Sequence, residues 1–173
     1  FEPDVYTDAR GSFMEAWNAR DYGRHGLHVT FVQDNLSRSR GGVLRGLHFQ
    51  NPRPQGKLIS VLAGEVYDVI VDVQADSDTF GEWEGRVLSA ETAQQLYVPE
   101  GYAHGFVVTS DEALFHYKCT DFYHPEADRS VRWDDPQLGI DWPVTDPVLS
   151  DKDADAPVLN EMPADALRFD AAR

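Results

Sequence analysis

The sequence has a single cysteine and no long hydrophobic run. Cys119 cannot form a disulfide within the chain, and the expected state of its thiol is buried and unreactive. No apolar run approaches the roughly 20 residues needed to cross a bilayer, and no charged-then-apolar leader opens the sequence. These absences predict a cytoplasmic protein.

Sequence motifs for metal and cofactor binding are also absent. The chain has no HExxH, no paired CxxC, no GxGxxG after a predicted strand and no P-loop. His25 and His28 are close in sequence, but they fall in a glycine-containing loop and make a poor metal site. The sequence therefore predicts no metal and no cofactor, and it does not support dinucleotide or NTP-hydrolysis chemistry.

Positive charge is scarce. The formal net charge is -15, with 30 acidic and 15 basic residues, and the only lysines are Lys57, Lys118 and Lys152. A surface this acidic should repel nucleic acids, which bind clustered cations. Two interpretations of the acidity stay open: an ordinary solvated surface, or adaptation to a salt-rich cell. Under either one, the few cations are available for an anionic ligand.

The chain does contain many short strand-forming segments separated by turns. Strands are predicted at residues 30–37, 43–50, 57–63, 65–73, 83–88, 95–98, 103–108 and 113–119. A short helix is predicted near residues 16–22, and the segment after residue 124 looks irregular. Regular short strands without long helices between them favour one antiparallel sandwich or barrel. The length of 173 residues and the apolar content of 42% suffice for a single domain with a core.

The predicted strand at residues 65–73 carries apolar residues on both faces. Val69 and Val71 fall on one face, whereas Val66 and Ile70 fall on the other together with Asp68. This pattern predicts burial on both sides of the strand. It is one reason to expect a homodimer.

The segment VLRGLHFQ, residues 43–50, is the richest in candidate chemistry. It places Arg45 and His48 in an otherwise apolar strand, and Lys57 opens the next strand nearby. An unpaired buried arginine is costly, so the pattern indicates an anionic partner. Residues three apart on a regular strand point to opposite faces. Either Arg45 and His48 do not share a pocket, or Gly46 marks a bulge that turns both to the same side, and we expect the bulge.

Three further segments hold candidate residues whose role the local pattern does not decide. His104 lies among small residues in PEGYAHGF, and it is either a ligand contact or a structural histidine. Tyr117 and Tyr123, in FHYKCTDFY, would share a face if the strand continues, although tyrosines in strands are mostly packing residues. LSDKD, residues 149–153, is by composition an exposed charged turn.

Taken together, these motifs resemble the dTDP-4-dehydrorhamnose 3,5-epimerase family of the cupin class. The resemblance covers nearly the whole chain, and the strings occur in the family's order. They are DARGSFMEAW (8–17), FVQDNLSRSRGGVLRGLHFQ (31–50), QGKL (55–58), GEVYDVIVDV (64–73), DTFGEWEG (78–85), VPEGYAHGF (98–106), YKCTDFYHPE (117–126), RWDDPQLGIDWP (132–143) and LSDKDADAP (149–157).

The resemblance implies an all-β, cupin-type jelly-roll barrel with short flanking helices. It implies a single domain over residues 1–173, with the barrel at about 28–123 and an irregular wrap at 124–173. It also implies a homodimer that binds a dTDP-sugar and uses no cofactor.

The resemblance also assigns roles to residues. His48 matches the catalytic base, Asp153 its paired carboxylate, Tyr117 the proton donor and Lys57 the cation beside the developing enolate. Tyr123 matches the tyrosine that stacks on the thymine base. The other substrate-binding positions match Arg10, Glu15, Gln33, Asp34, Asn35, Arg45, His104 and Lys152. Asp128 stands where the family often has glutamate.

The reaction that the resemblance implies is epimerisation of dTDP-4-dehydro-6-deoxy-D-glucose at carbons 3 and 5. Both carbons flank the keto group at carbon 4, so loss of either proton gives an enolate. The enolate needs a base and a fixed cation, and inversion needs an acid on the opposite face. His48, Lys57 and Tyr117 fit these three requirements.

Three alternatives stay open. The chain could epimerise one carbon only or act on a related dTDP-sugar. It could be a metal-dependent cupin oxygenase or isomerase, which would need a set of His and Glu ligands in the barrel. It could also be a non-catalytic sugar-binding module, which would keep Arg45 and Tyr123 but have no use for His48 and Tyr117.

Overall fold

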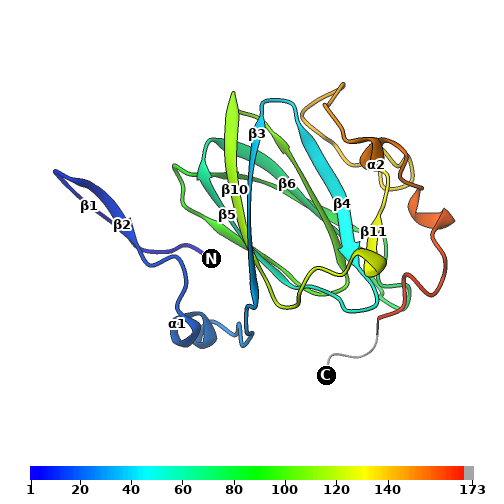
Figure 1. Cartoon of the computed structure of the whole chain (residues 1–173), viewed down its shortest axis with the longest axis horizontal. Coiled ribbons are helices and arrows are strands. Elements are labelled where there is room, and N and C mark those ends of the chain that lie inside the picture. The colour runs from blue at the N-terminus through cyan, green and yellow to red at the C-terminus, as the bar shows by residue number, and fades with distance from the viewer. Residues whose placement is uncertain (170–173) are drawn as a thin grey trace.

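The computed structural model describes residues 1–169 and consists of two facing antiparallel sheets with a projecting N-terminal arm (Figure 1). The four-stranded sheet has the order β3-β10-β5-β8, and the five-stranded sheet has the order β11-β4-β9-β6-β7. The strands are β1 (Val5–Asp8), β2 (Gly11–Met14), β3 (Gln33–Arg40), β4 (Leu44–Gln50), β5 (Lys57–Ala63), β6 (Glu65–Asp72), β7 (Trp83–Ser89), β8 (Gln95–Val98), β9 (Tyr102–Val108), β10 (Glu112–Cys119) and β11 (Asp128–Ser130). The helices are α1 (Ala19–Arg24), α2 (Asp151–Ala154) and two 3₁₀ turns, Pro125–Ala127 and Leu159–Glu161.

The all-β prediction is confirmed, and the strands from β4 to β10 begin and end within a residue or so of their predicted bounds. The predicted helix near residues 16–22 begins later, at Ala19, because the Asn18 side chain caps it by accepting a hydrogen bond from Arg20 N–H. The strand predicted at residues 30–37 lies three residues later, as β3, and β1, β2 and β11 were not predicted from the sequence. No helix in the described part of the chain is long and apolar enough to cross a membrane.

Apolar side chains from both sheets fill the space between them. Val61 and Phe115 come from the four-stranded sheet, and Val66, Phe106 and Val108 come from the five-stranded sheet. The rings of Phe106 and Phe115 stack with centroids 4.0 Å apart. This core occupies one part of the interior and leaves the part between β10 and β4 for polar side chains.

The segment after β11 covers the outer face of the five-stranded sheet. Leu138, Trp142 and Leu159 pack there against Val69 and Val71 of β6. This packing gives β6 its burial on both faces within a single chain. The apolar pattern of residues 65–73 therefore needs no second copy to explain it, and it does not bear on the expected homodimer.

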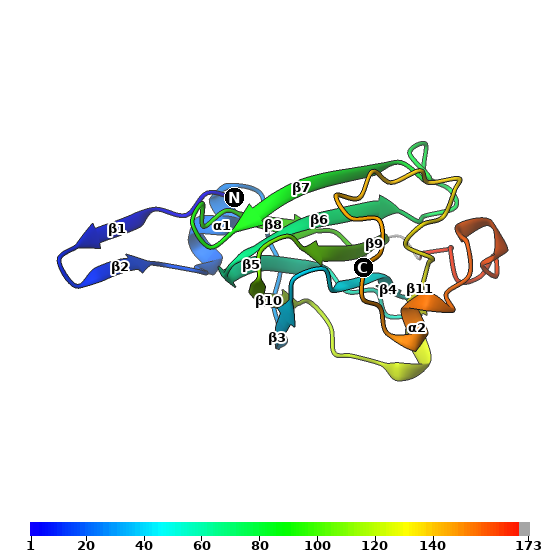
Figure 2. The same ribbon diagram turned by 90° about the horizontal axis from the view of Figure 1, so that it is seen from above.

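The β1–β2 hairpin extends away from the two sheets (Figure 2). We call residues 5–14 the arm. Its apolar side chains are exposed, with Tyr6 at 64% and Phe13 at 70% of their possible surface. After the arm, α1 returns to the barrel, where Tyr22 and Leu27 bury Leu58 on the outer face of the four-stranded sheet.

Candidate active site

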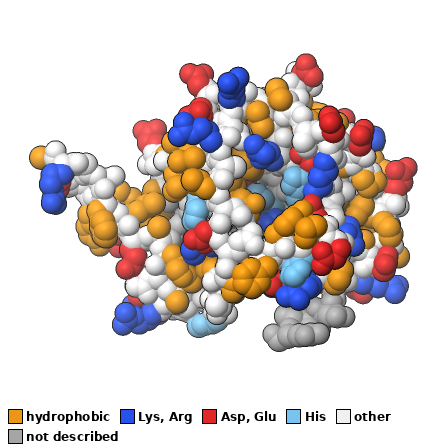
Figure 3. Space-filling view, viewed as in Figure 1, with side chains coloured by type: hydrophobic (Ala, Val, Ile, Leu, Met, Phe, Trp, Pro, Cys, Tyr) orange, Lys and Arg blue, Asp and Glu red, His pale blue; other side chains and the backbone are white. Residues whose placement is uncertain are grey.

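A polar cavity of 410 Å³ lies between β3 and β10 on one side and β4 and β9 on the other. Figure 3 shows basic and histidine side chains at this hollow, with acidic side chains both on this face and around the outline of the molecule. The predicted site residues that line the cavity are Asn35, Arg45, His48, Lys57, His104, Tyr117, Tyr123, Asp128, Lys152 and Asp153. The fold thus brings together residues from both sheets and from the C-terminal wrap.

A bulge at Gly46 turns Arg45 and His48 into this cavity. In the ladder between β4 and β9, Arg45 pairs with Phe106 and His48 pairs with His104, so β4 carries one extra residue. Gly46 has φ 138°, and an added Cβ would lie 2.5 Å from the Gly105 Cα atom. Arg45 is then held by Ser39, whose hydroxyl accepts a hydrogen bond from Nε at 3.0 Å.

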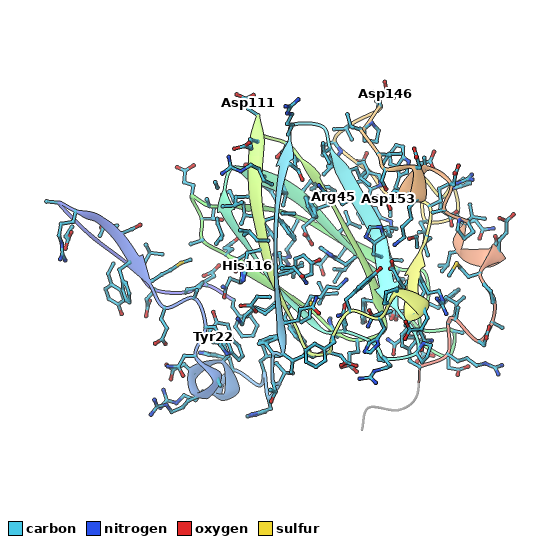
Figure 4. All side chains as sticks on the ribbon, viewed as in Figure 1. Tyr22, Arg45, Asp111, His116, Asp146 and Asp153 are labelled. Atoms are coloured by element: carbon cyan, nitrogen blue, oxygen red, sulfur yellow. The ribbon has the colours of Figure 1, made fainter. Side chains whose placement is uncertain are left out.

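His48 is paired with a buried carboxylate from the wrap. Its Nε2 atom lies 2.5 Å from Asp153 Oδ1, and the Asp153 side chain is only 4% exposed whereas His48 is 32% exposed. Burial alone would raise the pKa of Asp153, but hydrogen bonds from His48, Ser150 and the Gly46 N–H outweigh it and hold the pKa below its usual range. Asp153 is therefore ionised at neutral pH and can orient the imidazole. Figure 4 shows Asp153 and Arg45 beside each other near β4 and α2.

Tyr117 and Lys57 come from the four-stranded sheet, which faces β4. Burial raises the pKa of the Tyr117 phenol, with Arg45 opposing, so the hydroxyl stays protonated at neutral pH. Burial lowers the pKa of the Lys57 ammonium, while Cys119, Asp128 and Asp68 oppose that fall. Lys57 Nζ donates to the backbone oxygen of His48 at 3.4 Å. His48 and Tyr117 thus face the cavity from opposite sheets.

The mouth of the cavity carries a polar network in which Tyr123 and Lys152 are exposed and Asp128 is half-buried. Asp128 accepts a hydrogen bond from the Tyr123 hydroxyl at 3.1 Å and forms an ion pair with Lys152. Strand β10 ends at Cys119, so Tyr123 reaches the cavity from a loop rather than from a continued strand. The side chain of Gln33 supports this loop by accepting from Tyr123 N–H at 2.9 Å, and it also donates to Asn35.

The other predicted binding residues lie away from this cavity in the single chain. Arg10 is at the tip of the arm, where it pairs with Asp8 and is 89% exposed. Glu15 follows the arm and borders a separate hollow near α1. Asp34 is on the outer face of β3, where it pairs with Lys118. The binding roles of these residues stay predictions.

Asp68, which had no role predicted from the sequence, is linked to the cavity through His104. Its Oδ2 atom is 2.9 Å from His104 Nε2, and its side chain is completely buried. The signal was present, because an aspartate in the apolar strand 65–73 needs a partner. The identity of that partner, 36 residues along the chain, could not be read from local pattern.

Comparison with known proteins agrees with this geometry. The family model described as dTDP-4-dehydrorhamnose 3,5-epimerase matches residues 1–161. The chain belongs to this family. A relative of that name from Methanothermobacter thermautotrophicus is 54% identical over 165 residues, covering 94% of this chain and 89% of the relative.

Solved structures of this epimerase family share the fold. The dTDP-6-deoxy-D-glucose-3,5-epimerase of Legionella pneumophila, in complex with dTDP-4-keto-L-rhamnose, has a TM-score of 0.95 and 53% identity, over 99% of this chain and 92% of that one. A 3'-monoepimerase from Streptomyces bikiniensis, in complex with dTDP-quinovose, has a TM-score of 0.90 and 34% identity, over 98% and 87% of the two chains. The expectation of a cupin-like epimerase fold is confirmed.

Within residues 1–169, no group of three or more His, Cys, Asp or Glu side chains is placed to hold a metal ion. The alternative of a metal-dependent cupin enzyme therefore has no ligand set in this part of the chain.

Proposed function

We propose that the protein epimerises dTDP-4-dehydro-6-deoxy-D-glucose at carbons 3 and 5 to dTDP-4-dehydro-L-rhamnose, as a step of dTDP-rhamnose biosynthesis. The observation that carries the proposal is the placement of the His48–Asp153 pair and Tyr117 on facing walls of one cavity. A base and an acid on opposite sides are what inversion of a carbon beside a ketone requires. Family membership supports the choice of substrate.

The first step is removal of a proton by His48. Asp153 holds the imidazole through Nε2, so the Nδ1 nitrogen is free to take the proton from carbon 3 or carbon 5 of the sugar. The buried carboxylate also stabilises the imidazolium that forms. No redox change occurs, so the chemistry itself calls for no redox cofactor.

The second requirement is to stabilise the enolate. Its negative charge develops on the oxygen at carbon 4, and the Lys57 ammonium is the buried cation of the cavity. Carboxylates of Asp128 and Asp68 counteract the fall in the lysine pKa that burial causes, which favours the charged form. A preorganised cation in a water-poor site stabilises such a charge strongly.

The third step returns a proton on the opposite face. Tyr117 projects from β10 toward β4, and its raised pKa keeps the phenol protonated. Donation by Tyr117 to the enolate carbon completes the inversion, because His48 holds the proton it removed on the other face. Proton exchange with water then resets both groups.

Binding of the nucleotide portion falls to the mouth of the cavity. Arg45 and Lys152 are cations that line it, and a diphosphate is their natural ligand. Tyr123 is 53% exposed, which leaves its ring face available for the thymine base. Asp128 connects Tyr123 and Lys152, so it orients two binding residues at once.

Proton NMR in heavy water tests the proposal directly. Incubation of the keto sugar nucleotide with the protein should place deuterium at carbons 3 and 5 and yield the L-rhamno product. Exchange at only one carbon would identify a mono-epimerase instead. Binding without exchange would identify a sugar-binding module, and exchange lost with a chelator and restored by a metal would identify a metal-dependent enzyme.

Two substitutions separate the base from the acid. His48→Ala should reduce exchange at both carbons by about 10²- to 10⁴-fold, because the general base is lost at each step. Tyr117→Phe should spare exchange more than product formation, because the enolate still forms but is not protonated on the far face. His28→Ala is the matched control, since His28 is exposed and away from the cavity. Near-wild-type exchange by His48→Ala would overturn the assignment.

We also propose that the protein works as a homodimer in which the arm serves the partner. The arm exposes Tyr6 and Phe13, and the outer face of the four-stranded sheet exposes Leu36 (61%) and Leu62 (44%). Leu36 also borders the active-site cavity. An arm laid on the partner's β3 would cover these apolar side chains and bring Arg10 to the partner's cavity. Light scattering should then give about twice the chain mass of 19.5 kDa, and a 19.5 kDa species alone at micromolar concentration would refute the dimer.

The cytoplasmic location expected from the sequence stays a prediction. The substrate is a nucleotide-activated sugar, which supports that location.

A further inference from the structure

The cavity contains a second His–Asp pair beside the first one. His104 lies directly opposite His48 in the ladder between β9 and β4. Each histidine approaches its carboxylate with Nε2: His48 at 2.5 Å from Asp153, and His104 at 2.9 Å from Asp68. The two pairs differ in burial, because the side chain of His48 is 32% exposed and that of His104 is 8% exposed. The more accessible pair is the one proposed above as the base.

The hydrogen bond to Asp68 fixes how His104 faces the cavity. Burial raises the pKa of Asp68, while the neighbouring His104 and Lys57 oppose that rise and favour the ionised carboxylate. An ionised carboxylate only accepts hydrogen bonds, so with Asp68 ionised Nε2 carries the proton and Nδ1 is left on the other side of the ring. Nδ1 has no hydrogen-bond partner among the described side chains, and it is not one of the fully buried unpaired atoms. The stacked Phe115 ring, 6.0 Å away, limits tilting of the imidazole. Nδ1 is therefore the atom that His104 offers to a bound sugar.

The burial of Asp68 costs folding free energy. Asp68 is fully buried, and within residues 1–169 its Oδ1 atom has no hydrogen-bond partner. Burying a carboxylate with incomplete hydrogen bonding opposes folding. An apolar residue at this position would avoid that cost, so we look for a functional role of the carboxylate. Asp68 is also close enough to favour the charged form of Lys57.

We infer that Asp68 is a positioning residue of the proposed epimerase. It holds His104 with the proton on Nε2 and with Nδ1 facing the keto sugar, and its negative charge stabilises the Lys57 ammonium beside the enolate. His104 then contacts the oxygen functions around carbon 4, opposite the Lys57 ammonium. Asp68 touches no substrate and acts through its neighbours. This inference rests on the proposed function.

The test compares two buried aspartates of the same strand. Asp68→Asn removes the charge and allows the amide to present its N–H₂ group, which favours the wrong histidine tautomer. We expect kcat for deuterium exchange to fall by about ten- to a hundredfold, less than the ~10²- to 10³-fold effect of deleting an oxyanion donor, with KM changed less than threefold. Asp72→Asn is the matched control, because Asp72 is equally buried in β6 but binds Ser77 and Thr79 away from the cavity. It should leave kcat within about twofold.

Three readouts separate positioning from a structural role. The melting temperature of Asp68→Asn should stay within a few degrees of wild type, because a poorly partnered buried charge is removed. The alkaline limb of the pH–rate profile should move to lower pH, because Lys57 loses one of the groups that raise its pKa; Cys119 and Asp128 still raise it and Lys152 still lowers it. The double variant Asp68→Asn/His104→Gln should be no slower than the slower single variant. Unchanged kcat in Asp68→Asn, or losses that multiply in the double variant, would overturn the inference.

A measurement on the unsubstituted protein remains decisive if Asp68→Asn does not fold. Nitrogen-15 NMR of the histidine rings, assigned through the missing signal in His104→Gln, should show a protonated Nε2 in His104. A neutral His104 with a bare Nε2 would overturn the inference. Absence of deuterium exchange by the wild-type protein would overturn the proposed function but not the inference about Asp68. The tautomer of His104 would still decide that inference.

Discussion

The two segments that flank the barrel differ in the burial of their apolar residues. The C-terminal wrap buries Leu138 and Trp142 against its own five-stranded sheet, whereas the N-terminal arm holds Tyr6 and Phe13 in solvent. Both segments carry residues that the sequence assigned to the site. The wrap delivers Asp153 to the cavity of its own chain, and the arm carries Arg10 away from it.

The difference indicates where each segment acts. A segment that buries its apolar side chains on its own barrel can position a carboxylate accurately, because packing fixes its backbone. A segment with exposed apolar side chains has no such restraint within the chain, and large exposed apolar groups are typical of interaction surfaces. We therefore expect the wrap to act in its own subunit and the arm to act in the partner.

The largest effect should come from removing the wrap's carboxylate. Asp153→Ala should lower kcat by about 10²- to 10⁴-fold, because His48 loses the group that orients it and balances its charge. Deuterium exchange at carbons 3 and 5 measures this loss. Asp155→Ala is a suitable control, because Asp155 follows the same short helix but is exposed. Activity close to wild type in Asp153→Ala would contradict the assignment of the dyad.

Stability should separate the two segments next. Trp142 packs edge-on against Tyr67 and donates its indole N–H to the Trp133 carbonyl at 2.8 Å, so Trp142→Ala should lower the free energy of unfolding by about 3–5 kcal/mol. Phe13→Ala should change chain stability by about 0.5 kcal/mol or less, but weaken dimerisation. Denaturant titration and sedimentation measure the two quantities. A large loss of chain stability in Phe13→Ala would mean that the arm packs on its own barrel.

A mixing experiment sharpens the comparison further. Arg10→Ala alone should slow the reaction by about tenfold through weaker binding of the anionic substrate. The Arg10→Ala and Asp153→Ala variants can be unfolded and refolded together to form mixed dimers. In a mixed dimer, one site has the intact His48–Asp153 dyad of the Arg10→Ala chain and the intact arm of the Asp153→Ala chain. Activity should therefore rise above that of either variant alone. No gain despite the formation of mixed dimers would show that Arg10 acts in its own subunit.

The smallest effect concerns the acidic surface shared by both segments. The net charge of -15 should make the melting temperature rise by a few degrees between low and molar potassium chloride, because the Debye length falls from ~10 Å at 0.1 M to ~3 Å at 1 M. Affinity for the dTDP-sugar should fall over the same range as contacts to the diphosphate are screened. A flat or falling melting temperature would leave the acidity as an ordinary solubility feature, and reject salt adaptation.

Much of the barrel could be predicted from local pattern. Short runs of strand-forming residues between turn residues predicted the observed bounds of β5 and β8. The bulge at Gly46 was also predicted, on the hypothesis that Arg45 and His48 share one pocket, and the register shift between them confirms it. The arm was missed because its strands bury nothing within the chain and leave no alternating signal.

The all-β class and the strings that identify the family could be read from the sequence alone. The sequence also pointed to Gly46 as the place of a bulge, but the reason that glycine is needed there, its close approach to Gly105, came from the structure. Which aspartate meets which histidine could be learned only from the folded chain. Asp153 reaches His48 across 105 residues and Asp68 reaches His104 across 36. Such pairing depends on how two sheets and a wrap pack together, which no local spacing of residues encodes.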